Sequence, residues 1–279
     1  MKHPPSGGEL PADFHSAADN AWALIDRAPG FLTEREGRFL ILAAACAPAD
    51  GAILEIGSFK GKSTVGLAAI ARHYGLGPVV AVDPHTAPSE TDPSLSGQAT
   101  SWDDFLNTLR SAGLESFVEP HRAFSQDLAR TWDRPIRLLW IDGDHTYRGV
   151  KLDVDLFTPF LADGAIIAFH DTLHEFDGPL RVFVDQVLRS DRYGPAGFSG
   201  SIGWAQFRPQ DGAQEHFRRA RRWLAKRCLP VVDLLKDGRN PTGARKLWFK
   251  LLRSRIPHDL PDALTWVRLT RSGHRRGVS

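Results

Sequence analysis

Four acidic residues lie at the ends of short apolar runs and are the first candidates for chemistry. They are Glu55, Asp83, Asp142 and Asp171, and each run has the length and composition of a buried strand. Ligands of open α/β sheets bind outside the carboxyl ends of the strands, so these acids should meet at one sheet edge. Carboxylates at that edge can accept hydrogen bonds from ligand hydroxyls or bind a cation.

The runs that carry these acids alternate with helical patterns, which favours an α/β fold with a mostly parallel sheet. The sequence predicts strands at 52–56, 79–83, 117–121, 136–142 and 165–171, and helices at 12–27, 33–47, 63–70, 101–111, 146–160 and 178–188. Thr33 and Glu36 have the spacing of a capping box. Residues 85–100 read as a loop or lid, and residues 198–207 as a closing antiparallel hairpin.

Residues 52–64 (AILEIGSFKGKST) read as a strand, a glycine turn and the start of a helix. Such a turn brings the backbone and the helix N-terminus close to a ligand, because glycine has no Cβ. The pattern Glu-x-Gly-x-x-x-Gly-x-Ser after an apolar strand resembles the cofactor loop of Rossmann-like, class I methyltransferases that use S-adenosylmethionine (SAM). The resemblance implies a mostly parallel seven-stranded sheet, SAM as cofactor, and cofactor contacts from Glu55, Gly57, Ser58, Gly61 and Ser63.

Three further residues are candidates for cofactor binding. Asp83 follows the second strand, where a carboxylate suits ribose hydroxyls; the alternative is an acid that only caps the turn at Pro84. Ser125 and Gln126 resemble the adenine-contacting turn of catechol-type O-methyltransferases, while Ser125 also suits the N-cap of a helix that runs to Thr131.

The segments 142–145 (DGDH) and 169–171 (FHD) together resemble the metal-dependent catechol and macrolide-sugar O-methyltransferases. The resemblance implies that Asp142, His170 and Asp171 hold a divalent cation, usually Mg²⁺, and that His145 is the base beside Asp142. His170 stands where these enzymes have an acid, and imidazole suits zinc, iron or nickel better than magnesium. Alternatively, Asp142 and Asp171 orient substrate hydroxyls without a metal, and His170 is a second base or only a strand-end residue.

Physical chemistry explains why a cation would help. A sugar hydroxyl is about as weak an acid as water, whose pKa is ~16 and falls to ~7 on zinc, whereas the pKa of histidine is ~6.5. The gap of roughly nine units, or ~12 kcal/mol, must be closed by the metal or by proton transfer concerted with methyl transfer. The predicted reaction is methyl transfer to a hydroxyl of a sugar, glycoside or other small natural product; the sugar preference rests on resemblance alone.

A nucleotide-binding hydrolase is a rival interpretation, because residues 57–63 (GSFKGKS) nearly match a phosphate-binding P-loop. That motif needs four residues between its glycines, and only three lie here. Glu55 at the loop entrance would also repel phosphates. We therefore favour the methyltransferase interpretation.

Composition indicates a globular protein with two differently charged parts. Apolar residues make up 42% of the 279 residues and charged residues 24%. Two cysteines, Cys46 and Cys228, cannot build a disulfide framework, and the polar N-terminus has no signal-peptide core, so we expect a cytoplasmic protein. Residues 214–279 carry 17 basic and 5 acidic residues, whereas the preceding residues carry 18 and 28.

The basic tail contains two amphipathic helical patterns, at 214–228 and 244–256. Their predicted stripes are Phe217, Ala220, Leu224 and Cys228, then Leu247, Trp248, Leu251, Leu252 and Ile256. Such helices dock on the parent domain or on a second subunit of a homo-oligomer, or they bind an anionic glycan or the inner membrane surface. Nucleic acid is disfavoured, since no nucleic-acid-binding motif is present. We divide the chain into an N-terminal helical lead (1–49), a methyltransferase domain (50–209) and a basic helical extension (210–279).

Overall fold

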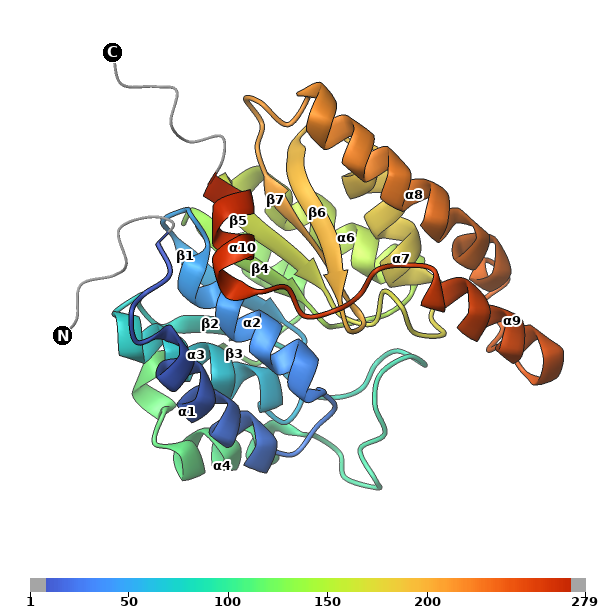
Figure 1. The fold of residues 1–279 in the computed structure, drawn as a ribbon. Coiled ribbons are helices and arrows are strands. Elements are labelled where there is room, and N and C mark those ends of the chain that lie inside the picture. The colour runs from blue at the N-terminus through green and yellow to red at the C-terminus, as the bar shows by residue number, and fades with distance from the viewer. Residues whose placement is uncertain (1–8, 272–279) are drawn as a thin grey trace, which may run out of the picture.

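The computed structural model describes residues 9–271, which form a seven-stranded sheet covered by helices on both faces (Figure 1). The strand order is β3-β2-β1-β4-β5-β7-β6. The first five strands are parallel, and β7 runs antiparallel to both β5 and β6. This is the mostly parallel seven-stranded sheet of Rossmann-like methyltransferases. The strands are β1 (Ala52–Ile56), β2 (Val79–Val82), β3 (Val118–His121), β4 (Ile136–Ile141), β5 (Leu161–Phe169), β6 (Tyr193–Ser199) and β7 (Ile202–Phe207).

The helices begin and end close to the predicted positions, with three differences. The helix predicted at 63–70 continues to Tyr74. The helix predicted at 146–160 ends at Phe157 and is followed by a 3-10 turn, and the helix predicted at 178–188 changes to a π-helix at Phe183. The helical elements are α1 (Phe14–Arg27), α2 (Glu34–Cys46), α3 (Lys62–Tyr74), α4 (Trp102–Ala112), η1 (Glu115–Phe117), α5 (Ser125–Ala129), α6 (Tyr147–Phe157), η2 (Thr158–Phe160), α7 (Gly178–Val182), η3 (Phe183–Leu188), α8 (Glu215–Leu235), α9 (Gly243–Ser254) and α10 (Ala263–Arg271).

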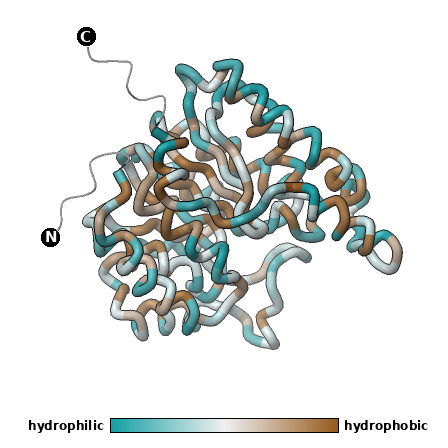
Figure 2. Tube along the Cα trace, viewed as in Figure 1, coloured by the Kyte–Doolittle hydropathy of each residue, from teal (hydrophilic) through white to brown (hydrophobic). Residues whose placement is uncertain are grey.

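Helix α8, the first helix of the basic extension, packs along β6 and η3. Figure 2 shows hydrophilic and hydrophobic residues interleaved along α8 and α9. The predicted stripe on α8 was wrong at Ala220, which is exposed, while its neighbour Arg221 is only 1% exposed. The Arg221 guanidinium donates hydrogen bonds to the backbone carbonyls of Tyr193, Gly194 and Gly212. A buried arginine is tolerated there because carbonyl oxygens satisfy its donors.

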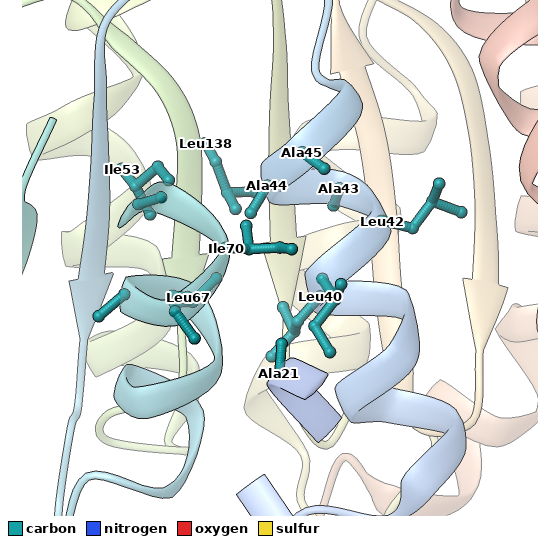
Figure 3. Packing of buried hydrophobic residues seen from close by; sticks show 14 of the residues in the cluster. Ala21, Leu40, Leu42, Ala43, Ala44, Ala45, Ile53, Leu67, Ile70 and Leu138 are labelled. Atoms are coloured by element: carbon teal, nitrogen blue, oxygen red, sulfur yellow. The ribbon is translucent and has the colours of Figure 1, made fainter. Parts of the chain in front are cut away.

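Strand residues alternate between two cores, one on each face of the sheet. Ile53 and Leu138 face the core shared with α1, α2, α3 and α10, whereas Leu54 and Leu139 face the core shared with α6, α7 and α8. Figure 3 shows side chains of α2 and α3 packed together with those of β1 and β4. Because both faces are buried, these strands read as continuous apolar runs.

The last described helix, α10, packs on the face of the sheet that α1, α2 and α3 cover. Trp266 is fully buried, with its ring 6.2 Å from that of Phe39 on α2 and 5.7 Å from that of Trp204 on β7. Among residues 9–271, no helix is long and apolar enough to cross a membrane.

Candidate functional site

The glycine turn after β1 is held against the end of β4. The amide of Gly57 donates to the carbonyl of Val82 at 2.9 Å, and the amide of Asp142 donates to the carbonyl of Ile56 at 2.8 Å. Gly57 has a φ of +84°, and a Cβ atom there would lie 2.2 Å from the carbonyl oxygen of Asp142. Only glycine permits this approach, which brings the ends of β1, β2 and β4 together.

These strand ends open into one cavity of about 900 Å³ at the carboxyl edge of the sheet. Its lining includes most of the predicted site residues: Gly57, Ser58, Ser63, Asp83, Ser125, Gln126, Asp142, His145, His170 and Asp171. Glu55 and Gly61 are not part of the lining. Gly61 is instead the N-cap residue of α3, with a φ of +87°.

Glu55 lies beneath the loop and is fully buried. Its carboxylate accepts hydrogen bonds from the hydroxyls of Ser63 and Thr64, the latter at 2.6 Å. Burial raises the pKa of Glu55 to about 8, although both hydroxyls act in the opposite direction. The carboxyl therefore ties β1 to the first turn of α3 and shapes the loop from below.

Asp83 links the glycine turn to the start of the lid. One oxygen accepts from the amide of Phe59 at 2.8 Å and the other from the amide of His85 at 2.5 Å. The turn-capping role is thus present. Each carboxylate oxygen of Asp83 can accept one more hydrogen bond. Because Asp83 also lines the cavity, it can accept from hydroxyl groups of a bound ligand.

Ser125 is the first residue of α5, whose N-cap residue is Phe124, so the alternative N-cap role of Ser125 was wrong. Its hydroxyl donates to Oδ1 of Asp153 on α6 at 2.6 Å. Burial raises the pKa of Asp153 to about 7, and Asp153 also lines the cavity. Asp153 was not identified from the sequence, in which it is only an acid near the apolar stripe of its helix.

The geometry of the loop disfavours the P-loop alternative. A P-loop lysine must reach the phosphates, but the ammonium of Lys62 donates to the carbonyls of Ile25 and Ala28, at 2.9 and 2.7 Å. The hydroxyl of Ser63, which would bind Mg²⁺ in a P-loop, is bonded to Glu55.

Two carboxylates and two imidazoles gather where β4 and β5 end. Ligand atoms of Asp142, His145, His170 and Asp171 all lie within 4.8 Å of one another. Oδ1 of Asp142 lies 2.9 Å from Nδ1 of His170 and 3.4 Å from Nε2 of His145, which is also 3.6 Å from Asp171. The ring of His145 stacks on Phe176 with centroids 4.6 Å apart.

Opposite charges dominate the protonation of this cluster. Burial lowers the pKa of His170, but Asp142, Asp171 and Glu36 outweigh burial and raise it well above 6.5. Burial also lowers the pKa of His145, but Asp142 and Asp171 outweigh burial and raise it. A divalent cation fits this donor set, because two carboxylates and two imidazoles within a few ångströms are a common transition-metal arrangement.

Glu36 on α2 completes the site and was recognised from the sequence only as part of a capping box, which the structure contains. Its other carboxylate oxygen accepts from the amide and hydroxyl of Ser201, at 2.8 and 2.7 Å, in the β6–β7 turn. Nε2 of His170 lies 3.8 Å from Glu36, beyond hydrogen-bond distance. Because Ser201 is 165 residues away, no local pattern could reveal this contact.

The predicted lid, residues 85–100, lies over the cavity as irregular chain and is anchored on Asp144. Oδ1 of Asp144 accepts from the hydroxyls of Ser89 and Thr91, at 3.0 and 3.1 Å. The hydroxyl of Thr91 also accepts from the amide of His145 at 2.9 Å. Thr91 therefore fixes the lid directly beside the acid–histidine cluster.

Comparisons with known proteins agree with this geometry. Residues 54–172 match a protein-family model described as a methyltransferase domain. The O-methyltransferase NovP has a similar structure, with a TM-score of 0.55, 14% identity, and coverage of 63% of this chain and 81% of NovP. Cofactor-bound Rv0187 from MTB is also similar, with a TM-score of 0.50, 21% identity, and coverage of 69% of this chain and 90% of Rv0187.

Proposed function

We propose that the protein is a class I SAM-dependent methyltransferase that methylates a hydroxyl of a sugar, glycoside or other small natural product, and the match of residues 54–172 to a methyltransferase-domain model supports this. The observation that carries the proposal is the convergence of the glycine loop, Asp83 and the acid–histidine cluster on one cavity. A methyl donor and an activated oxygen must meet within such a space. The similarity to NovP, named as an O-methyltransferase, supports oxygen as the acceptor atom.

The proposed contacts to SAM come from the segments that follow β1, β2 and β3, which are neighbouring strands of the sheet. The backbone at Gly57 and Ser58 approaches the amino-acid part of SAM, and Asp83 accepts from the ribose hydroxyls. Ser125 and Gln126 border the place proposed for adenine, where Asp153 can take part through its carboxyl. Glu55 and Gly61 act indirectly, since one braces the loop and the other begins α3.

On the acceptor side, the reaction is an in-line displacement. The acceptor oxygen bonds to the methyl carbon, the carbon–sulfur bond breaks, S-adenosylhomocysteine leaves, and His145 takes the hydroxyl proton. Asp142, His170 and Asp171 are the residues proposed to hold a divalent cation. When bound there, a cation would lower the pKa of a coordinated hydroxyl.

His145 can accept the proton only while one of its ring nitrogens is free. Nε2 faces Asp142 and Asp171, and the buried Nδ1 has no hydrogen-bond partner among residues 9–271. We propose that His145 is the base and that the cation has three protein ligands. A cation held by Nε2 of His145 as well would exclude that nitrogen from proton transfer.

The test is a methyl-transfer screen over glycosides and phenols, with and without a chelator, that measures S-adenosylhomocysteine and the mass of the product. We expect transfer to a hydroxyl that chelation reduces and added divalent cation restores. Calorimetry with SAM and ATP provides the control for the rival function. Tight ATP binding without SAM binding would end the methyltransferase proposal.

A second measurement separates the two roles of His145. The variant His145→Ala should lower kcat by about 10²- to 10⁴-fold, the usual contribution of a general base, and leave cation affinity nearly unchanged. The variant Asp142→Ala should lose both activity and cation binding. Loss of cation binding in His145→Ala would instead make His145 a ligand.

A further inference from the structure

Helix α9 has a second apolar face that residues 9–271 leave about half exposed. Phe249 and Leu252 are buried, whereas Leu247, Trp248 and Leu251 are 70%, 49% and 44% exposed. Positions 247, 248 and 251 lie on one side of a helix, because residues one and four apart are neighbours around it. The helix therefore packs on the protein through one side and presents leucine and tryptophan to the outside through the other.

Basic residues surround this face. Lys250 and Arg255 are exposed, and α9 contains no acidic residue. On α8, Trp223 is 46% exposed and the guanidinium of Arg227 lies 4.1 Å from the centre of its ring. Residues 215–255 carry 13 basic and 3 acidic residues, which gives this part of the chain an excess of positive charge.

The position of α9 makes this face accessible and places it near the cavity. In Figure 1 α9 extends outward from the end of α8, away from the sheet. The ammonium of Lys246 pairs with Glu175 at 2.9 Å. Glu175 stands between His174 and Phe176, which both line the cavity, so α9 lies beside the cavity mouth.

We propose that α9, together with Trp223 of α8, is an interfacial docking surface for an anionic phospholipid bilayer. Interfacial helices bury an apolar face at the headgroup–acyl boundary while lysine and arginine contact anionic headgroups. Tryptophan favours that boundary because its ring is apolar and its N–H is polar. Each basic residue near an anionic surface strengthens binding by about fivefold.

The charge of this surface favours a bilayer over a second copy of the chain as its binding partner. A two-fold contact through α9 would bring two surfaces with the same excess of basic residues together, and like charges across an interface oppose association. A bilayer that contains anionic lipids supplies both complements at once, an apolar layer and negative headgroups. The proposal does not depend on methyl transfer, because docking is measured on the protein without SAM or acceptor.

The experiment is co-sedimentation of the full chain with phosphatidylcholine vesicles, either pure or containing phosphatidylglycerol, at physiological salt. We expect binding to the mixed vesicles that weakens as salt rises, and at least about tenfold weaker partitioning for the double variant Leu247→Ser/Trp248→Ser. The charge-reversal variant Lys250→Glu/Arg255→Glu should weaken binding by at least about 25-fold, about fivefold for each of the two basic residues removed. Leu264→Ser on α10, where the leucine is also 44% exposed, is the matched control and should bind within about twofold of the unmodified chain.

Circular dichroism and melting temperatures first establish that each variant is folded. Failure of the unmodified chain to bind the mixed vesicles would overturn the proposal, as would unchanged binding by both double variants. Sedimentation velocity supplies a further criterion without vesicles. A dimer that Leu247→Ser/Trp248→Ser dissociates would make the face a subunit contact and also overturn the proposal.

Discussion

Gly57 approaches the end of β4 so closely that a Cβ atom would lie 2.2 Å from the carbonyl oxygen of Asp142. The cofactor loop and the acid–histidine cluster are therefore joined through backbone contact. We expect Gly57→Ala to lower the free energy of unfolding by ~2–5 kcal/mol, since it combines left-handed strain of ~1–2 kcal/mol with overpacking of ~1–3 kcal/mol. Urea unfolding measures the change.

Gly77 provides a matched control for this substitution. Its φ is also +84°, but a Cβ atom there would meet nothing within 4 Å. Gly77→Ala should therefore cost only the conformational strain, about 1–2 kcal/mol. Equal losses in the two variants would show that the approach to Asp142 has no energetic consequence.

The imidazole of His170 should decide which cation the site prefers. We expect the unmodified protein to bind Mn²⁺ or Zn²⁺ more tightly than Mg²⁺, because Mg²⁺ selects oxygen ligands. His170→Asp should raise the affinity for Mg²⁺ relative to Zn²⁺ by about tenfold or more, as measured by calorimetry. His174→Asp, at a half-exposed position 3.8 Å from Asp171, is the control. An unchanged ratio of Mg²⁺ affinity to Zn²⁺ affinity in His170→Asp would refute a ligand role for His170.

Glu55 should make stability depend on pH. Burial raises its pKa from 4.5 to about 8, so between these values the unfolded chain releases a proton that the folded chain keeps. The contribution of Glu55 to the free energy of unfolding is therefore fully present below pH 4.5 and is lost as the pH rises through 8. Relative to the unmodified protein, Glu55→Gln should gain about 2–4 kcal/mol between pH 5 and pH 8, measured by urea unfolding.

The exposed Glu90 in the lid is the control for this measurement. Glu90→Gln makes the same carboxyl-to-amide change at an exposed position, so it measures the effect of the substitution without burial. A constant difference for Glu55→Gln would mean that the buried carboxyl is ionised in the folded protein throughout.

Thr91 should control how well the lid covers the acceptor. Thr91→Val keeps the shape of the side chain but removes the hydroxyl that bonds Asp144 and the amide of His145. Two lost hydrogen bonds of about 1 kcal/mol each predict a rise of roughly tenfold or more in the KM for the acceptor. Ser94→Ala is the control, because the Ser94 hydroxyl accepts only from an amide within the lid. Equal steady-state constants for the two variants would argue against the anchor.

Contacts that depend on local spacing were accessible from the sequence. The strand–glycine–helix unit at 52–64 was predicted correctly because its apolar run and its glycines are contiguous, and the capping box of α2 because Thr33 and Glu36 lie one turn apart. The acids after β4 and β5 could be grouped because parallel strands end at the same edge.

Contacts between distant segments could not be read in the same way. The carboxylate of Glu36 on α2 accepts from Ser201 in the β6–β7 turn. Arg221 can be buried because carbonyls at three other positions accept from its guanidinium. Periodicity placed Ala220 in the core and assigned no position to Arg221, whereas the structure exposes Ala220 and buries Arg221. Only the folded chain brings such partners together.

The return of α10 to the side of the sheet that carries the N-terminal helices affects the order of folding. Trp266 packs against Phe39 and Trp204. Because α10 is synthesised after all the other described elements, the core that contains the N-terminal helices is completed late in synthesis. Until that helix emerges, the nascent chain presents an uncovered aromatic surface, which is the kind of intermediate that chaperones bind.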